Sequence, residues 1–225
     1  MIEFRQVTKQ FGNGTVALEK VDFKIAPGEF VFFVGPSGSG KTTVLKLLMR
    51  QILASSGSIF LEKEDITALE PKKIPWLRRQ IGAIWQDFKL LPDRTVAENV
   101  SLPLEILAKP TAEIQKEVAE ILQTVGLEKQ ADLFPQQLSG GEIQRTVIGR
   151  ALAGQPSVLF ADEPTGNLDP GTAWQIVKLL KQINEKGKTV IMATHNFDVV
   201  DSLKERVIRL DQGKVVSDKK QGKYV

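Results

Sequence analysis

The residues that the sequence lacks already narrow the possibilities. There is no cysteine, which excludes disulfides, thiolate zinc sites and a cysteine nucleophile. The single histidine, His195, excludes any site that needs several imidazoles. No apolar run approaches the roughly 18–20 residues needed to cross a bilayer. Charged residues interrupt the first segment, MIEFRQVTKQFG, where a signal peptide would need an apolar core. We therefore expect the chain to reside in the cytoplasm.

Composition and charge are those of an ordinary globular protein. Of the 225 residues, 42 % are hydrophobic and 25 % are charged, which excludes a disordered tail and a collagen-like repeat. This length suffices for one substantial hydrophobic core. The net charge of +3 is too small to argue for nucleic acid, and no nucleic-acid partner is expected, although the charge permits an anionic ligand.

Strand and helix patterns alternate along most of the chain. Short apolar or alternating segments predict strands, and apolar residues three and four apart predict helices. The expected strands are 2–8, 16–25, 29–34, 58–61, 81–85, 157–161, 189–193, 207–210 and 214–217, and the expected helices are 44–49, 96–107, 112–125, 140–153 and 171–185. This order predicts an α/β fold with a mostly parallel sheet and antiparallel strands at the N-terminus. We expect one domain, 1–225, with a core lobe (1–86 and 154–225) and an inserted helical subdomain (about 87–153).

A glycine-rich loop follows the strand expected at 29–34. It matches the pattern G-x-x-x-x-G-K-[ST] and runs Gly35, Pro36, Ser37, Gly38, Ser39, Gly40, Lys41, Thr42, Thr43. Glycines let backbone N–H groups approach phosphate oxygens, and the start of the following helix favours an anion. Lys41 would reach the β- and γ-phosphates, and the Thr42 hydroxyl would bind Mg²⁺. A glycine-rich turn that contains Lys-Thr by chance is the alternative, and it leaves the flanking strand and helix unexplained.

Two carboxylates end the apolar strand expected at 157–161. Packing alone does not account for Asp162 and Glu163 at this place, since isolated buried charges are costly unless they are paired or bound to metal. Asp162 would hold Mg²⁺ through water, and Glu163 would act as the general base toward an attacking water. The alternative is a solvated strand end. Up to this point small-molecule kinases, GTPases and recombinase-like ATPases all remain possible.

The segment Leu138-Ser139-Gly140-Gly141-Glu142 decides between these families. The serine hydroxyl and glycine amides at a helix start form a second anion-binding corner, which stands 98 residues after Lys41. One active site rarely needs two such corners, but two identical chains could share them. The alternative is a helix cap followed by a glycine turn.

With this segment the chain resembles the ATP-binding-cassette (ABC) ATPase family over nearly its whole length. The motifs that carry the resemblance stand in family order: Phe11, the loop Gly35–Thr42, Gln86, LSGGE at 138–142, Asp162-Glu163, Asn167-Leu168-Asp169, and His195. The resemblance implies a head-to-tail, ATP-dependent homodimer with two ATP molecules sandwiched between the loop of one chain and LSGGE of the other. Ser139, Gly140 and Gly141 would then touch the γ-phosphate across the interface.

The resemblance also implies roles for single residues. Phe11 would stack on adenine, and Gln86 would sense Mg²⁺ and the attacking water. Asp169 would bridge the two chains, and His195 would contact the γ-phosphate and hold Glu163 and water in line. The alternatives are a loop packing role for Phe11 and an ordinary strand-end position for His195. The chain departs from the family at Asn196, where an aspartate is usual, and at Ile143, where many relatives carry glutamine.

Within the family, the segment 162–169 resembles a branch that holds the ATPases of cell division, lipoprotein release and macrolide efflux. Residues 77–82 and 93–96 are most similar to the cell-division members. That resemblance implies an integral membrane partner and transmission of ATP-driven shape changes to cell-wall hydrolases. A lipoprotein-release or efflux ATPase is the alternative. A DNA-repair ATPase is less compatible, because the region before LSGGE has no sustained heptads.

We expect the partner to dock a cytoplasmic helix on the surface formed by Gln86 and residues 87–99. Gln86 would feel the γ-phosphate, and the residues after it join the helical subdomain, so a docked helix would move with the ATP state. Apolar side chains in the apparent surface loop 88–92 suit such an interface. The alternative is that Phe88 and Leu90 pack the two lobes together.

Overall fold

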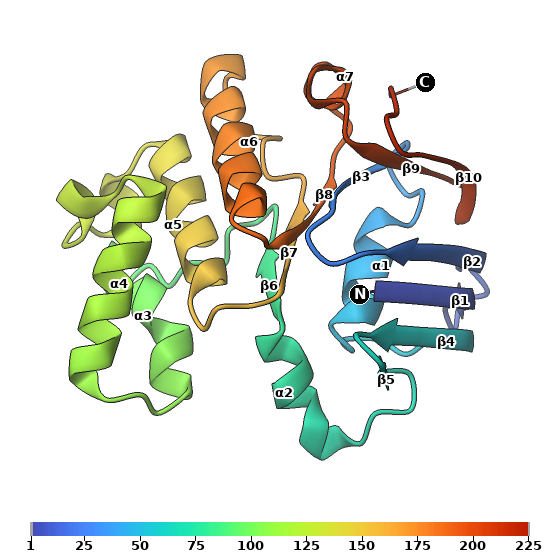
Figure 1. Cartoon of the computed structure of the whole chain (residues 1–225), viewed down its shortest axis with the longest axis horizontal. Coiled ribbons are helices and arrows are strands. Elements are labelled where there is room, and N and C mark those ends of the chain that lie inside the picture. Colours follow the sequence, from blue (N-terminus) through green and yellow to red (C-terminus); the bar gives the residue numbers. More distant parts are fainter. Residues whose placement is uncertain (1, 225) are drawn as a thin grey trace.

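The computed structural model describes residues 2–224, and its centre is a six-stranded sheet (Figure 1). The strand order is β10-β9-β3-β8-β7-β6. From β9 to β6 all neighbours are parallel, whereas β10 runs antiparallel to β9. The strands are β3 (Phe30–Val34), β6 (Ile81–Ile84), β7 (Val158–Asp162), β8 (Thr189–Ala193), β9 (Arg206–Asp211) and β10 (Lys214–Lys219). Because parallel strands end at the same edge, the segments after β3, β6, β7 and β8 lie at one edge of the sheet.

Both faces of this sheet are buried at its central strands. Every residue of β3, β7 and β8 is buried, as a parallel sheet covered on both sides requires. Successive side chains of β3 point to opposite faces of the sheet and pack into two separate hydrophobic cores. Phe32 packs into the core that holds the helical lobe, whereas Phe33 packs into the other core and stacks on Phe160 with ring centroids 6.3 Å apart. Burial of each such side chain contributes about 1.5–3 kcal/mol.

A second, antiparallel sheet covers one side of the molecule. Its order is β2-β1-β4-β5, and the strands are β1 (Ile2–Gln10), β2 (Val16–Ile25), β4 (Ser56–Leu61) and β5 (Glu64–Asp65). The inner side chains of β1, β2 and β4 pack with helix α1 (Lys41–Leu48) and with one face of the six-stranded sheet. The helix that begins at the glycine-rich loop is therefore anchored in a continuous hydrophobic core.

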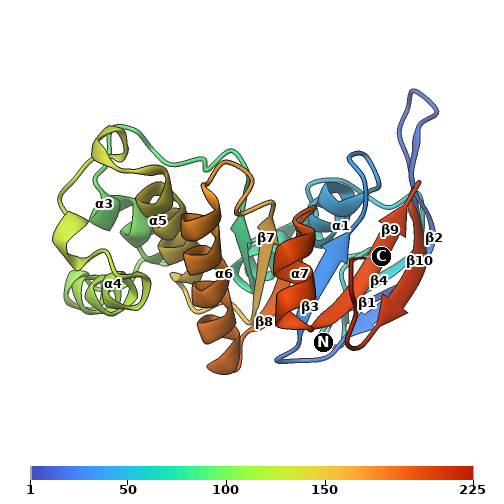
Figure 2. The ribbon, with the colours of Figure 1, turned by 90° about the horizontal axis from the view of Figure 1, so that it is seen from above.

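Helices form a lobe at the end of the molecule away from the second sheet (Figure 1). This lobe contains α3 (Val96–Ile106), α4 (Thr111–Val125) and α5 (Gly140–Leu152), with the short helices η2 (Glu128–Gln130) and η3 (Pro135–Gln137). Helices α6 (Pro170–Glu185) and α7 (Phe197–Leu203) follow β7 and β8 and lie between this lobe and β9 (Figure 2). The longest helix within residues 2–224, α6, has 16 residues, so this part of the chain holds no extended coiled coil.

The α/β class with a mostly parallel sheet and N-terminal antiparallel strands is confirmed. The sequence pattern missed β5 and five short helices, which are η1 (Pro71–Lys73), α2 (Ile74–Arg79), η2, η3 and α7. Elements of two to seven residues are too short to show a helical or strand period, and Pro75 near the start of α2 argues for a turn as readily as for a helix. Within residues 2–224 no helix has the length and apolar character that crossing a bilayer requires.

Candidate functional site

The glycine-rich loop joins the end of β3 to the start of α1, and two of its glycines take positions closed to other residues. Gly35 has a φ of +144°, and a Cβ there would lie 2.0 Å from the carbonyl oxygen of Leu210 on β9. Gly40 has a φ of +111°, and its Cβ would lie 2.6 Å from Cδ2 of Leu18 on β2. A side chain at either position would displace the loop from the strands behind it.

The Lys41 and Thr42 side chains are held by hydrogen bonds. Lys41 Nζ donates to the carbonyl oxygens of Gly35 and Pro36, at 2.8 and 3.0 Å, so the loop itself holds the ammonium group. The Thr42 hydroxyl donates to Asp162 Oδ2 at 2.7 Å. The start of α1 is thereby joined to the end of β7, 120 residues further along the chain.

Glu163 directly follows β7, and its carboxylate faces His195. His195 Nδ1 lies 3.0 Å from Glu163 Oε1, and the His195 backbone N–H donates to Glu163 Oε2 at 3.3 Å. Glu163 has a φ of +51°, a left-handed conformation that costs about 1–3 kcal/mol in a non-glycine residue. The His195 side chain is 68 % exposed and that of Glu163 only 12 %, so the carboxylate is sheltered while the imidazole reaches solvent.

These groups line one cavity of about 470 Å³. Its lining combines the loop with residues from the ends of three other strands: Ser37, Gly38, Gly40, Lys41, Thr42, Thr43, Gln86, Asp162, Glu163 and His195. Four segments that are distant in the sequence thus meet at the carboxyl edge of the sheet. Gly35, Pro36 and Ser39 do not line the cavity. They shape the loop instead, where the Ser39 N–H donates to the Pro36 carbonyl oxygen at 3.2 Å.

The donors at this cavity fit Mg²⁺. The Thr42 hydroxyl, the Asp162 carboxylate and the Gln86 side-chain amide offer oxygen ligands, which Mg²⁺ prefers. Within residues 2–224, no group of three or more His, Cys, Asp or Glu side chains could hold a metal alone. The protein oxygens at this cavity therefore suit an ion whose remaining ligands are phosphate oxygens and water.

Asp162 is an unusual place for a negative charge. It is 5 % exposed, and burial raises the pKa of its carboxyl, although the hydrogen bond from Thr42 acts in the opposite direction. The folded chain therefore binds this proton more readily than the unfolded chain does. Its contribution to stability is present in full at low pH and is lost as the pH rises through the raised pKa.

Asp162→Asn is accordingly expected to raise the Tm of the nucleotide-free chain at neutral pH. The asparagine oxygen can still accept from Thr42 while the buried charge is gone, and each ~1 kcal/mol of added stability corresponds to roughly 2–4 °C for a domain of this size. The Tm gap to the wild-type chain should close as the pH falls, and stabilisation by MgATP should be lost. Thermal melts between about pH 4 and pH 8 measure both effects. Asp132→Asn, at an exposed site, is the control, and an Asp162→Asn chain that melts below wild type at neutral pH contradicts the argument.

The LSGGE segment lies outside this cavity, at the start of α5. The Ser139 hydroxyl donates to Glu142 Oε2 at 2.6 Å, and the Ser139 N–H donates to the same oxygen at 2.8 Å. These hydrogen bonds hold the pKa of the Glu142 carboxyl below its usual range. Ser139 and Gly140 are exposed. The structure thus forms the helix cap and leaves the positive end of α5 open to solvent.

Phe11 and Asp169 also lie outside the cavity. Phe11 stands in the turn between β1 and β2, 38 % exposed, with Lys9 Nζ 5.1 Å from its ring centroid. This turn and the glycine-rich loop lie on the same side of the molecule in Figure 2. Asp169 caps α6, and its hydrogen bonds with Thr172 lower the pKa of its carboxyl. Asn196 caps α7 in the same way, so the asparagine preserves a cap that aspartate would also form.

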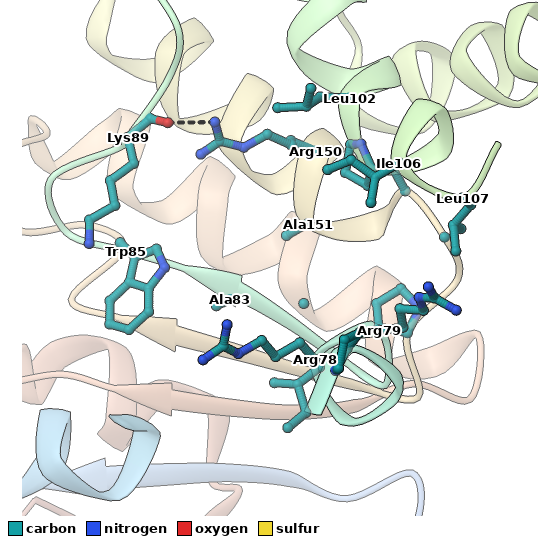
Figure 3. Close-up of a pocket in the computed structure, with 17 residues that line it drawn as sticks. Arg78, Arg79, Ala83, Trp85, Lys89, Leu102, Ile106, Leu107, Arg150 and Ala151 are labelled. Atoms are coloured by element: carbon teal, nitrogen blue, oxygen red, sulfur yellow. Dashed lines mark hydrogen bonds between the residues drawn. The ribbon is translucent and has the colours of Figure 1, made fainter. Parts of the chain in front are cut away.

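A second cavity of about 640 Å³ lies between the two lobes (Figure 3). We call it the interlobe groove, and β6, α2, α3, the end of α5 and the segment around Trp85–Lys89 line it. Its lining includes four cationic side chains and no Asp or Glu; the cations are Arg78, Arg79, Lys89 and Arg150. Apolar surface comes from Trp85, Leu102 and Ile106, and Ile106 is 70 % exposed.

Sequence reasoning missed this groove, although α3 carries a signal for it. The buried side of α3 is the stripe Val96, Val100 and Leu104. Leu102 and Ile106 stand four residues apart on a second apolar stripe, which packing of the helix onto its own lobe does not require.

Comparison with known proteins agrees with this geometry. A family model described as "ABC transporter" matches residues 18–166. A "Cell division ATP-binding protein FtsE" of Bacillus subtilis (strain 168) is 47 % identical over 224 residues, covering 100 % of this chain and 98 % of that protein. A "Methionine import ATP-binding protein MetN" of Xanthomonas oryzae pv. oryzae (strain MAFF 311018) is 46 % identical over 220 residues, which are 96 % of this chain but 66 % of that protein.

A solved structure shares the fold over its whole length. The dimeric post-hydrolysis state of the ATP-binding cassette MJ0796, bound to ADP and Pi, superposes with a TM-score of 0.89 at 38 % identity, covering 99 % of both chains. The resemblance of the sequence to the cell-division branch is confirmed by the full-length match to FtsE. The family match and these full-length similarities together establish that the chain belongs to the ATP-binding-cassette (ABC) family of ATPases.

Proposed function

We propose that the chain hydrolyses ATP as the ATPase subunit of a membrane complex that acts in cell division. Its partner would be an integral membrane protein resembling FtsX, with the chain held at the cytoplasmic face of the bacterial inner membrane. The observation that carries the proposal is the 470 Å³ cavity, where the phosphate loop, Asp162 and the His195-bound Glu163 meet. The full-length similarity to FtsE supports the cell-division role.

The reaction follows from the side chains at the cavity. When ATP binds, Lys41 Nζ leaves the carbonyl oxygens of Gly35 and Pro36 and binds oxygens of the β- and γ-phosphates instead. Glu163 accepts a proton from water as the water oxygen attacks the γ-phosphorus, the bond to the β-γ bridging oxygen breaks, and ADP and phosphate leave. His195 fixes the direction of the Glu163 carboxylate through both contacts to it. Mg²⁺ would neutralise phosphate charge, and Thr42, Gln86 and Asp162 would hold it.

The dimer is proposed because several of the predicted ATP contacts, among them Ser139, Gly140 and Asp169, lie outside the cavity. Ser139 and Gly140 are exposed at the positive end of α5, and Asp169 is exposed at the start of α6. A second chain placed head to tail would bring these groups to the first chain's ATP. The dimeric state of MJ0796 supports the formation of a dimer.

The packing of Phe88 and Leu90 leaves less of the loop 88–92 free for a partner, and the proposed docking surface moves to the interlobe groove. Phe88 and Leu90 are partly buried and pack against the main core, which agrees with the alternative interpretation of these two residues. Leu91 is 38 % exposed and remains available. We therefore propose that the partner's cytoplasmic helix lies in the interlobe groove, which has apolar walls and is continuous with the segment after Gln86.

Ile106→Arg tests this site. The variant places a fifth cation in a cationic groove at an exposed position, so membrane recruitment and co-purification with the partner should fall at least about tenfold. Nucleotide binding, measured as the MgATP-induced rise in Tm, should remain. Val216→Arg on β10, 54 % exposed and remote from the groove, is the matched control. Co-purification of Ile106→Arg at the level of Val216→Arg would place the docking site elsewhere.

A further inference from the structure

The turn that follows Gln86 has an unusual backbone. Phe88 and Lys89 have φ values of +57° and +51°, two consecutive left-handed residues, neither of them glycine. Local hydrogen bonds close the turn, from the Phe88 N–H to Trp85 O at 3.2 Å and from the Lys89 N–H to Asp87 O at 2.6 Å. Such a conformation persists only where the surroundings impose it.

Arg150 holds this turn from α5. Its guanidinium donates to the carbonyl oxygens of Phe88 and Lys89, at 2.8 and 2.5 Å. Figure 3 shows the side chain reaching from α5 across the top of the groove toward Lys89. None of the ion pairs within residues 2–224 involves Arg150, and burial lowers the pKa of its guanidinium. The two carbonyl oxygens are therefore the partners that hold this charge in a partly buried place.

Arg150 and Ser139 lie at opposite ends of the same helix, so the contact of Arg150 with the turn links that turn to Ser139. Arg150 lies in the last turn of α5, and Ser139 caps the first turn of the same helix. The 13 residues of α5 form a rod about 20 Å long, held by buried residues such as Val147 and Ile148. At the C-terminal end of α5, Arg150 hydrogen-bonds to the turn next to Gln86. Gln86 itself lines the chain's own ATP cavity. The other end of the helix presents Ser139.

We propose that Arg150 is a positioning residue that locks the turn after Gln86 to α5, so that Gln86 and Ser139 move as one body. Gln86 responds to the chain's own ATP, and Ser139 closes on the ATP of the second chain. Arg150 and Lys89 also line the interlobe groove, so a docked partner contacts the same lock. This inference rests on the proposed ATPase cycle and adds to it a physical link between the two nucleotide sites.

The test compares Arg150→Gln with Arg145→Gln in the full-length chain. Arg145 lies on the same helix and makes a similar pair of hydrogen bonds, to Val125 O and to Gln175, both at 3.0 Å and away from the turn. Arg150→Gln should lower kcat by roughly 10- to 100-fold, the scale for misplacement of a reacting group by about 1 Å. The KM for ATP and the MgATP-induced rise in Tm should stay within about twofold. Arg145→Gln should keep kcat within about twofold of wild type.

A second readout follows the turn itself. In a background with Trp76→Phe and Trp174→Phe, Trp85 is the remaining tryptophan, and Lys89 Nζ lies 4.5 Å from its ring centroid. MgATP should change the Trp85 emission in this background and after Arg145→Gln, and should change it far less after Arg150→Gln. Arg150→Lys, whose single ammonium bonds one carbonyl well, should give an intermediate kcat and response.

The outcomes separate the inference from the proposed function. The Trp85 readout depends on ATP binding, so it tests the lock even in a chain that does not hydrolyse ATP. The inference is overturned when Arg150→Gln loses no more kcat than Arg145→Gln. It is also overturned when the loss of kcat is matched by a loss of MgATP binding. A Trp85 response of Arg150→Gln equal to that of Arg145→Gln overturns it as well.

Discussion

Glu163→Gln chains are expected to bind MgATP normally and to turn it over roughly 10²–10³ times more slowly than the wild-type chain. The amide keeps the shape of the carboxylate but cannot accept the proton of the attacking water. His195 Nδ1, 3.0 Å from the carboxylate, can still hydrogen-bond to the amide oxygen, so the geometry of the strand ends should persist. The loss should therefore appear in kcat and leave the MgATP-induced rise in Tm unchanged.

A consequence of arrested hydrolysis is a change in assembly. ATP that is bound but not cleaved keeps the two chains closed on it, so Glu163→Gln should elute as a dimer on size-exclusion chromatography with MgATP and as a monomer without it. Glu185→Gln, an exposed carboxylate at the end of α6, is the matched control and should behave as wild type. Near-normal turnover by Glu163→Gln would remove Glu163 from the role of general base.

The sequence predicts the site better than it predicts the surface around it. The glycine pattern of 35–42 has strict physical demands, which the contacts of Gly35 and Gly40 with Leu210 and Leu18 show. The same holds for a strand that ends in Asp162 and Glu163, since buried carboxylates need a partner. Residues with such demands stand out in a single sequence, and the cavity brings most of them together.

The interlobe groove and the Arg150 contact could not be predicted in the same way. Both depend on where the helical lobe lies relative to β6, which no local pattern encodes. In the sequence, Arg150 looks like any cation in the last turn of a helix. Phe88 and Lys89 have left-handed backbones, but neither is a glycine or an asparagine, the residues that usually indicate this conformation. Phe88 is ambiguous in the sequence because an apolar residue in a loop suits an interface as well as a core, and only the packing distinguishes the two.

A mixture of two inactive chains should recover activity when the ATP site is shared. Lys41→Ala removes the ammonium that would bind the phosphates, and Ser139→Arg places a bulky cation where the other chain's γ-phosphate would lie. A mixed dimer then has one site with both defects and one site with neither. Random pairing of equal amounts makes half of the dimers mixed, so independent sites would give about a quarter of wild-type activity. Each variant alone should show roughly 1 % or less.

The MgATP-induced rise in Tm of each variant shows whether Ser139 contacts the ATP of its own chain or that of the other chain. Ser139→Arg should retain the MgATP-induced rise in Tm as a monomer, because its own loop, Lys41 and Thr42 are unchanged and Ser139 lies outside the cavity. Loss of the helix cap should lower its Tm by an amount that corresponds to about 1 kcal/mol. Lys41→Ala should lose the MgATP effect. A chain with both substitutions, mixed with Lys41→Ala, is the negative control, because no loop in that mixture keeps its lysine. A Ser139→Arg monomer that fails to bind ATP would place Ser139 at its own chain's nucleotide and contradict the shared site.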